Sequence, residues 1–183
     1  MSYREDNDLE FLSKCSSEEL NDLVDCILHS SNEELSDSFE YQHYVPDHCR
    51  YWENIAAEIQ KFGGNSIVNA VRGTGVTYRE ILCDVCNQLG VKYSQSVTVS
   101  EIEHSLLSSL NLVRKDGEKK EDYFPRVKDK SQKLASKVSR KNFFQQSILG
   151  GSLSGVLLTG PAFRVTVPVV IQVAILRGLV CKD

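Results

Sequence analysis

Residues 163–180 read FRVTVPVVIQVAILRGLV, and this apolar stretch decides how the chain must fold. Between Ile148 and Val180 only Arg164 and Arg177 are charged. Because so much apolar surface is unfavourable in water, the stretch belongs either in a protein core or in a lipid interface. We expect a helix from about residue 167 to 179, capped by Thr166 and with Pro168 as its first residue.

The residues just before this stretch, ILGGSLSGVLLTGPAF, are rich in glycine. With the helix that follows, they predict an apolar helical hairpin, and we call residues 148–183 the apolar tail. Its apolar run over residues 165–176 is too short to cross a bilayer unaided. The favoured interpretation is a hairpin that completes the core, and the alternative is a segment that enters a membrane interface.

A basic segment precedes the apolar tail. Residues 114–141 carry eleven Lys/Arg and five Asp/Glu, a net charge of +6. Residues 114–129 lack apolar periodicity and contain Gly117 and Pro125, which predicts a loop or linker, and a basic helix is expected to continue from there to about residue 149. A basic helix that leads into an apolar segment is typical of peripheral membrane association. The candidate contacts with a partner or membrane are Lys133, Lys137, Arg140, Lys141, Phe143, Phe144, Phe163 and Arg164.

Farther toward the N-terminus, capping boxes mark helix starts, because Ser or Thr is followed three residues later by Glu. They stand at Ser16/Glu19, Ser31/Glu34, Thr77/Glu80 and Thr98/Glu101. The expected helices run from 16 to about 29, from 31 to about 41, from 78 to 89 and from 98 to about 110. A helical turn near residues 9–12, a helix that ends at Gly63 and a short helix over 66–72 complete the set.

These elements predict a mainly α protein, a compact multi-helix bundle with an apolar, Gly-rich C-terminal tail. We divide it into an acidic N-terminal helical segment (1–45), a central helical body (46–113), a basic linker and helix (114–147) and the apolar tail (148–183). Residues 1–60 carry fifteen Asp/Glu and three Lys/Arg, a net charge of −12. The acidic and basic segments are expected either to attract each other or to face separate partners.

No residue pattern of a known catalytic centre is present, and we assign no catalytic, cofactor-binding or metal-binding residue. Cys83 and Cys86 have the spacing of half a metal site, but they lie inside a predicted helix, so core packing is the favoured interpretation. His43, His48 and Cys49 cluster in one loop without a fourth ligand nearby. A surface loop is therefore favoured there over a metal site.

The compartment follows from the N-terminus, which begins with charged residues and has no apolar signal stretch. We expect a cytoplasmic protein with reduced thiols, and peripheral association with the inner membrane is the second expectation. Cys26, Cys83, Cys86 and Cys181 have apolar neighbours and are expected to be small buried side chains.

The helices over 66–72 and 78–89, joined by a glycine turn, resemble a helix-turn-helix motif. The second helix offers Arg79 beside Glu80 and Asp84, which is poor chemistry for phosphate contacts. Nucleic acid is therefore the least favoured partner.

Three segments resemble the YaaW-like family of bacterial proteins: DLEFLSKCSSEEL (8–20), FGGNSIVNAVRGTGVTYREILCDVCNQLGVK (62–92) and FRVTVPVVIQVAILRGLV (163–180). The segment from about 111 to 150 is shorter than in longer family members. The resemblance implies a helical fold and a bacterial cytoplasmic setting. Through the family's distant relation to the ubiquinol–cytochrome c chaperone domain, it also implies an assembly or chaperone-like role, and it transfers no catalytic residue.

The sequence thus favours a non-enzymatic interaction or assembly module that binds a protein partner. The first alternative is a peripheral membrane protein that uses the basic helix and the apolar tail, and the second is a nucleic-acid binder. The placement of residues 148–180, inside the body or available to a membrane, distinguishes the first two. The sequence names neither the partner nor the oligomeric state.

Overall fold

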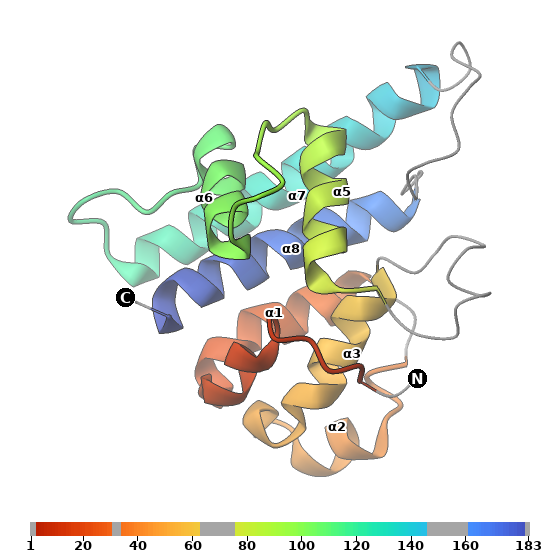
Figure 1. Ribbon diagram of the computed structural model, residues 1–183. Coiled ribbons are helices and arrows are strands. Elements are labelled where there is room, and N and C mark those ends of the chain that lie inside the picture. Colours follow the sequence, from red (N-terminus) through yellow and green to blue (C-terminus); the bar gives the residue numbers. More distant parts are fainter. Residues whose placement is uncertain (1–2, 31–33, 63–75, 146–160, 182–183) are drawn as a thin grey trace.

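The computed structural model describes residues 3–30, 34–62, 76–145 and 161–181, and the regular elements in these ranges are all helices (Figure 1). The mainly α fold predicted from the sequence is therefore confirmed. In chain order, the elements are the 3-10 helix η1 (Glu10–Lys14), α1 (Ser17–Ser30), α2 (Phe39–Tyr44), the 3-10 helix η2 (His48–Tyr51), α3 (Trp52–Phe62), α5 (Tyr78–Leu89), α6 (Val99–Ser109), α7 (Lys120–Gln145) and α8 (Pro161–Val180).

Capping boxes start three of these helices where the sequence predicts them. The Ser16 amide donates to Glu19 Oε2 at 2.9 Å at the start of α1. Thr77 and Thr98 form the same reciprocal pair with the glutamate three residues later. Each box satisfies backbone N–H groups that the first turn of a helix leaves without partners.

The helix predicted to start at Ser31 is wrong. Residues 34–37 form turns, and α2 begins at Phe39, where the Ser38 hydroxyl accepts the amide of Tyr41 at 3.2 Å. Glu34 does not cap a helix here, because its carboxylate is 2.6 Å from the ammonium of Lys61 on α3. Residues 31–33 and the short helix expected over 66–72 lie outside the described residues.

The linker predicted over residues 114–129 is also wrong beyond its first part. Helix α7 begins at Lys120 and contains Pro125, which removes one backbone hydrogen bond. Packing compensates for this loss, since Tyr123 and Val127 lie one turn apart and are both buried, whereas Pro125 is exposed. Contacts with the rest of the fold therefore outweigh the local preference for a loop.

The helix predicted in the apolar tail is confirmed as α8, but it starts earlier than expected. Pro161 is its first residue, and Pro168 lies inside it. The hydroxyl of Thr166 does not cap the helix and instead donates to the carbonyl oxygen of Phe62 at 3.4 Å. Proline suits a first helical position because its nitrogen has no hydrogen to leave unpaired, and Pro161 fills that position in place of Pro168.

Helix α8 lies at the centre of the molecule (Figure 1). It packs most extensively against α7 and α1, and it also contacts α6, α5 and α3. Its side chains from Thr166 to Arg177 are all buried. A helix that is apolar all round is typical of a core position, and each of its aliphatic side chains contributes roughly 1.5–3 kcal/mol on burial. Residues 166–177 of the apolar tail are therefore core.

The cysteines divide into buried and exposed thiols. Cys26 and Cys86 are buried as predicted, and Cys83 is half-buried. Cys181 is exposed, so its predicted burial is wrong, because it lies one residue beyond the end of α8. The four cysteines expected to behave as apolar side chains thus do so only where they lie inside a packed helix.

Candidate partner-binding groove

The feature that holds α8 in register is a buried polar network. Arg177 on α8 and Glu103 on α6 form an ion pair with 2.9 Å between Nε and Oε2, and both residues are buried. The hydroxyl of the buried Tyr78 on α5 donates to the other oxygen of Glu103 at 2.7 Å. Three helices are thereby joined through one carboxylate.

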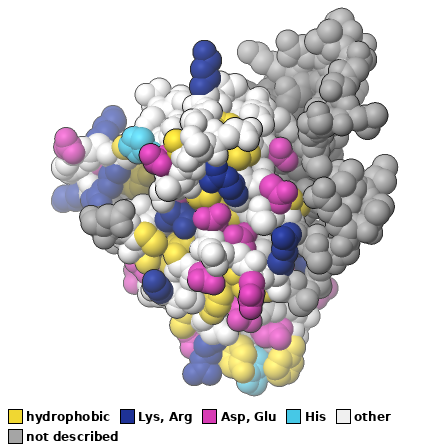
Figure 2. Space-filling view, viewed as in Figure 1, with side chains coloured by type: hydrophobic (Ala, Val, Ile, Leu, Met, Phe, Trp, Pro, Cys, Tyr) yellow, Lys and Arg dark blue, Asp and Glu magenta, His cyan; other side chains and the backbone are white. Residues whose placement is uncertain are grey.

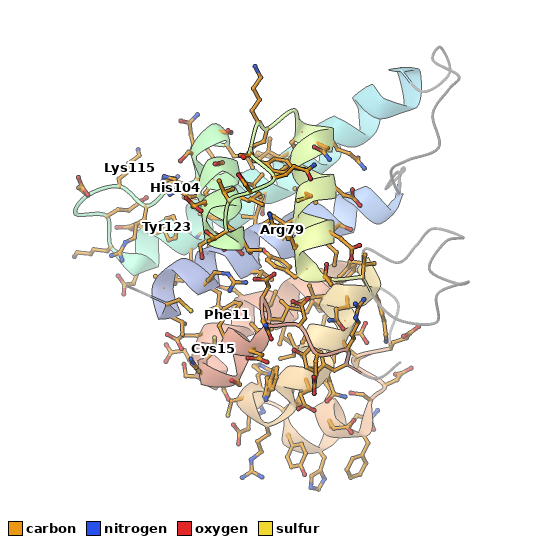
Figure 3. The ribbon with its side chains drawn as sticks, in the orientation of Figure 1. Phe11, Cys15, Arg79, His104, Lys115 and Tyr123 are labelled. Carbon is orange, nitrogen blue, oxygen red and sulfur yellow. The ribbon has the colours of Figure 1, made fainter. Side chains whose placement is uncertain are left out.

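Residues of the N-terminal segment also take part in this network. The Arg177 guanidinium donates to the backbone carbonyl of Asp8 and lies 4.3 Å from the ring centre of Phe11, which Figure 3 places between this segment and α8. The carboxylate of Asp6 accepts the backbone amide of Tyr78 at 2.7 Å. Burial raises the pKa of Glu103, while Arg177 opposes the rise. The pairing offsets the cost of burying both charges.

Beside Arg177, the last turns of α8 form the floor of a groove between α1 and α7. Leu176 is buried in the floor, and Leu179 is partly exposed to the groove. The groove has a volume of about 670 Å³, and we call it the α1–α7 groove. It is lined by Ser16, which directly precedes α1, by Glu18, Glu19, Asn21 and Asp22 of α1, by Glu121, Phe124, Pro125 and Lys128 of α7, and by Leu176 and Leu179 of α8.

The rim of the α1–α7 groove is acidic. Four of its lining residues are carboxylates and one, Lys128, is a cation. The ammonium of Lys128 already faces Asp25 of α1 across 3.6 Å. This contact joins the acidic N-terminal segment to the basic segment. The groove combines apolar floor residues with a negative edge.

The contact residues predicted from the sequence lie elsewhere. Lys133 is exposed on α7, 2.6 Å from Asp129. Lys137, Arg140, Lys141, Phe143 and Phe144 belong to the C-terminal part of α7, and Phe163 and Arg164 to the first turn of α8. The side chains of residues 135–145 and 161–165 lie outside the described part of the structure, so these contacts stay predictions. Except for Lys133, which is five residues beyond the groove residue Lys128 on α7, they lie far along the helices from the groove, which α7 lines near its start and α8 near its end.

Sequence reasoning did not find the groove because its lining comes from three distant segments. Within the basic segment, Phe124 and Pro125 are apolar residues among charged ones. This local pattern was the available sign of the groove in the sequence. Pro125 instead favours a loop in the sequence pattern, so no helix face is expected there. Only the packing of α1 and α7 against α8 brings the lining residues to one place.

The structure also shows the surroundings of residues weighed as metal or nucleic-acid contacts. In those residues, no three His, Cys, Asp or Glu side chains are grouped so that they could hold a metal ion. His48 is buried, and its ring nitrogens face the hydroxyl of Tyr51 and, at 2.8 Å, Asn21 Oδ1. Arg79, the cation expected to contact phosphate, donates instead to the carbonyls of Gln95 and Val97 at 2.7 and 2.9 Å.

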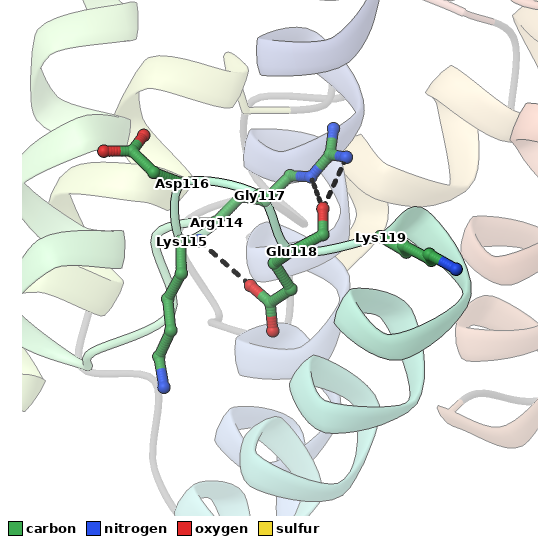
Figure 4. Close-up of a pocket in the computed structure, with 6 residues that line it drawn as sticks. All are labelled: Arg114, Lys115, Asp116, Gly117, Glu118 and Lys119. Atoms are coloured by element: carbon green, nitrogen blue, oxygen red, sulfur yellow. Dashed lines mark hydrogen bonds between the residues drawn. The ribbon is translucent and has the colours of Figure 1, made fainter.

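A second hollow lies at the loop of residues 114–119 (Figure 4). Three of its residues are cations, but Glu118 fills its interior. The carboxylate of Glu118 accepts the amide of Lys115 at 2.9 Å and the Nε of Arg126 at 2.7 Å. These donors lower the pKa of Glu118 to about 2, so the carboxylate takes the place that an anionic ligand would need.

Among the described residues, Phe39 and His43 form an exposed aromatic cluster. Phe39 on α2 is 69% exposed and stacks on His43, with 5.3 Å between ring centres. Figure 2 shows hydrophobic side chains and a histidine at the lower tip of the molecule, where Figure 1 places α2. Unlike the groove, this cluster has no concave wall.

None of the described helices is both long enough and apolar enough to cross a bilayer.

Comparison with known proteins places the chain among uncharacterised bacterial proteins. A family model described as a domain of unknown function, DUF3944, matches residues 3–35, which include Asp8, Phe11 and the α1 wall of the groove. The chain is 33% identical to the UPF0174 protein YaaW of Escherichia coli K12 over 232 aligned positions, which cover 98% of this chain and 97% of that protein. No solved structure matches.

Relatives from Helicobacter pylori match over shorter stretches. One UPF0174 protein is 40% identical over 116 residues, which is 60% of this chain and 46% of that protein. Another is 47% identical over 79 residues, which is 43% of this chain and 38% of that protein. The chain thus spans less than half the length of these relatives. The alignment with YaaW is also longer than the 183 residues of this chain, so that relative contains residues that this chain lacks.

Proposed function

The chain belongs to the UPF0174 family, which includes YaaW, and from this premise we propose that it is a non-enzymatic interaction module that binds a protein partner in the α1–α7 groove. The observation that carries the proposal is the groove itself, an apolar floor under an acidic rim. Protein interfaces combine a buried apolar centre with a polar edge in this way.

The rigidity of the floor supports this function. Leu176 and Leu179 flank Arg177, whose ion pair with Glu103 ties α8 to α6. A floor that is already in place costs little conformational entropy when a partner binds. The finer assignment, a chaperone-like assembly role, stays a prediction from the distant family relation.

Burial of α8 favours a protein partner over a membrane surface. A membrane device would need its apolar residues available, yet residues 166–177 are covered by α7, α1 and their neighbours. The acidic groove would in addition repel anionic lipid. The basic half of α7 is the remaining support for the membrane alternative.

A photo-crosslinking experiment in the native host tests the proposal. A photoreactive amino acid is placed at Asn21 or at Leu179 in the groove, and at the exposed Gln42 of α2 as the control position. We expect the two groove positions to yield the same discrete protein adduct, and Gln42 to yield none. The adduct should also disappear when Phe124→Ser is added to the Asn21 probe, with folding checked by circular dichroism.

Two results would count against the proposal. One is the absence of a specific adduct at both groove positions. The other is an identical set of adducts at the groove and at Gln42, since that pattern reports random collisions and no binding site.

A further inference from the structure

We propose that the occupant of the α1–α7 groove is a cationic amphipathic helix of the partner protein. This inference rests on the proposed function and specifies the chemistry of the partner. The inference follows from three properties of the groove. Its floor is apolar, its rim carries negative charge, and the charge of Lys128 is balanced by Asp25.

The floor suits the apolar face of a helix. Phe124 and Pro125 from α7 and Leu179 from α8 supply the accessible apolar surface of the groove, and the buried Leu176 completes its floor. An amphipathic helix presents apolar side chains at intervals of three and four residues, so several can enter one groove together. A volume of about 670 Å³ accommodates such a row of side chains.

The rim carries negative charge that the fold does not use for ion pairs. Within the described residues, Glu18, Asp22 and Glu121 form no ion pair. Glu18 and Glu121 lie in the first turns of their helices, where the backbone favours negative charge.

Asp22 has no such role, and it lies four residues after Glu18 on the same helix. Like charges at this spacing repel each other and destabilise a helix. A cationic partner would remove that repulsion on binding.

The single cation of the groove does not oppose this assignment. Lys128 is directed to Asp25, with 3.6 Å between ammonium and carboxylate. Its charge is therefore largely balanced within the protein, and the rim as a whole stays negative. Opposite charge around an apolar centre speeds association and selects against partners of the wrong sign.

The probes are two synthetic helical peptides of about 18 residues, the length of roughly five helical turns. Both have leucines at the same positions, and the remaining positions carry lysine in one peptide and glutamate in the other. Binding to the full chain is measured by fluorescence anisotropy at low salt and again at higher salt. We expect the lysine peptide to bind at least about tenfold more tightly than the glutamate peptide, and to weaken as salt rises.

A charge reversal in the groove locates the binding site. The variant Asp22→Lys/Glu121→Lys should weaken the lysine peptide by at least about tenfold and improve binding of the glutamate peptide. The matched control is Glu5→Lys/Glu53→Lys, which makes the same change in net charge at exposed positions outside the groove. The control should bind both peptides as the unchanged protein does, within about twofold.

Each other outcome has a defined meaning. Equal affinity for the two peptides, or equal losses in both double variants, overturns the cationic-helix inference. If neither peptide binds while the groove positions still crosslink to a protein, this inference fails and the proposed function stands. A crosslinked adduct with the mass of two copies of this chain would also overturn it, because the occupant would then be a second copy.

Discussion

At the residue scale, one buried ion pair connects several parts of the fold. Arg177 reaches Glu103, the carbonyl of Asp8 and the ring of Phe11, so a single side chain joins α8 to α6 and to the N-terminal segment. The sequence marks Arg177 as one of two charges in an apolar stretch, but it does not identify Glu103 as its partner. That pairing depends on a contact between residues 74 positions apart, and no local pattern encodes it.

The variant Arg177→Met should lower the free energy of unfolding by about 3–5 kcal/mol, because it leaves the Glu103 carboxylate buried without its cation. Urea denaturation followed by circular dichroism measures the change. The double variant Arg177→Met/Glu103→Gln should lose less than the sum of the two single variants, since it leaves no isolated charge. Additive losses would show that the two side chains act independently.

A second residue-scale prediction concerns pH. Burial, with a smaller contribution from Glu80, raises the pKa of Asp84 on α5 from 3.8 to about 6. The folded state therefore holds this proton more tightly than the unfolded state, and the stability gained from it is lost as pH rises from about 4 to about 6.

The variant Asp84→Asn should then be more stable than the unchanged protein at pH 7, by about 1–2 kcal/mol after allowance for solvent screening. The two proteins should converge at pH 4. Thermal or urea unfolding at the two pH values makes the comparison, and a constant difference at both would refute the assignment.

At the element scale, the helices that carry capping boxes were predictable to within a residue or two. Thr77/Glu80 and Thr98/Glu101 satisfy orphaned amides with residues that lie next to each other in sequence, so the signal is local. The capping box expected at Ser31 gave a wrong helix start, because Glu34 pairs with Lys61 on another helix. The loop predicted over 114–129 was also wrong because of contacts with distant parts of the fold. Burial of Tyr123 and Val127 overrides the effect of Pro125.

The local origin of the capping boxes can be tested on α6. The variant Thr98→Ala should lower the free energy of unfolding by about 1 kcal/mol, because the amide of Glu101 loses its acceptor. Thr98→Ser keeps the hydroxyl and should cost only a few tenths of a kcal/mol. Equal losses in the two variants would mean that the methyl group and not the hydroxyl stabilises this end of α6.

At the scale of the whole molecule, the residue pattern predicted a helical apolar tail. It did not decide whether the tail lies in the core or in a membrane interface. The placement depends on whether α1, α5, α6 and α7 leave space for another helix between them. They leave this space, and α8 occupies it and packs against all four. The groove is a consequence of the same packing, because α1 and α7 flank α8 and leave its last turns partly open.

Removal of α8 should therefore abolish the fold. A chain that ends at Gly160 loses the side chains that occupy the centre of the core, and we expect it to be unfolded by circular dichroism and to expose apolar surface that binds a hydrophobic dye. A chain shortened only by residues 182–183 is the control and should fold normally. A folded, soluble product that ends at Gly160 would contradict the central position of α8.

The most direct test of the core position of α8 is hydrogen exchange of the full chain, followed by mass spectrometry, with and without vesicles rich in anionic lipid. We expect the amides of residues 167–177 to be among the slowest in the protein to exchange, at rates set by global unfolding, and we expect vesicles not to change these rates. Fast exchange of these amides in solution, with protection that appears only when vesicles are added, would contradict it and identify α8 as a membrane-binding segment.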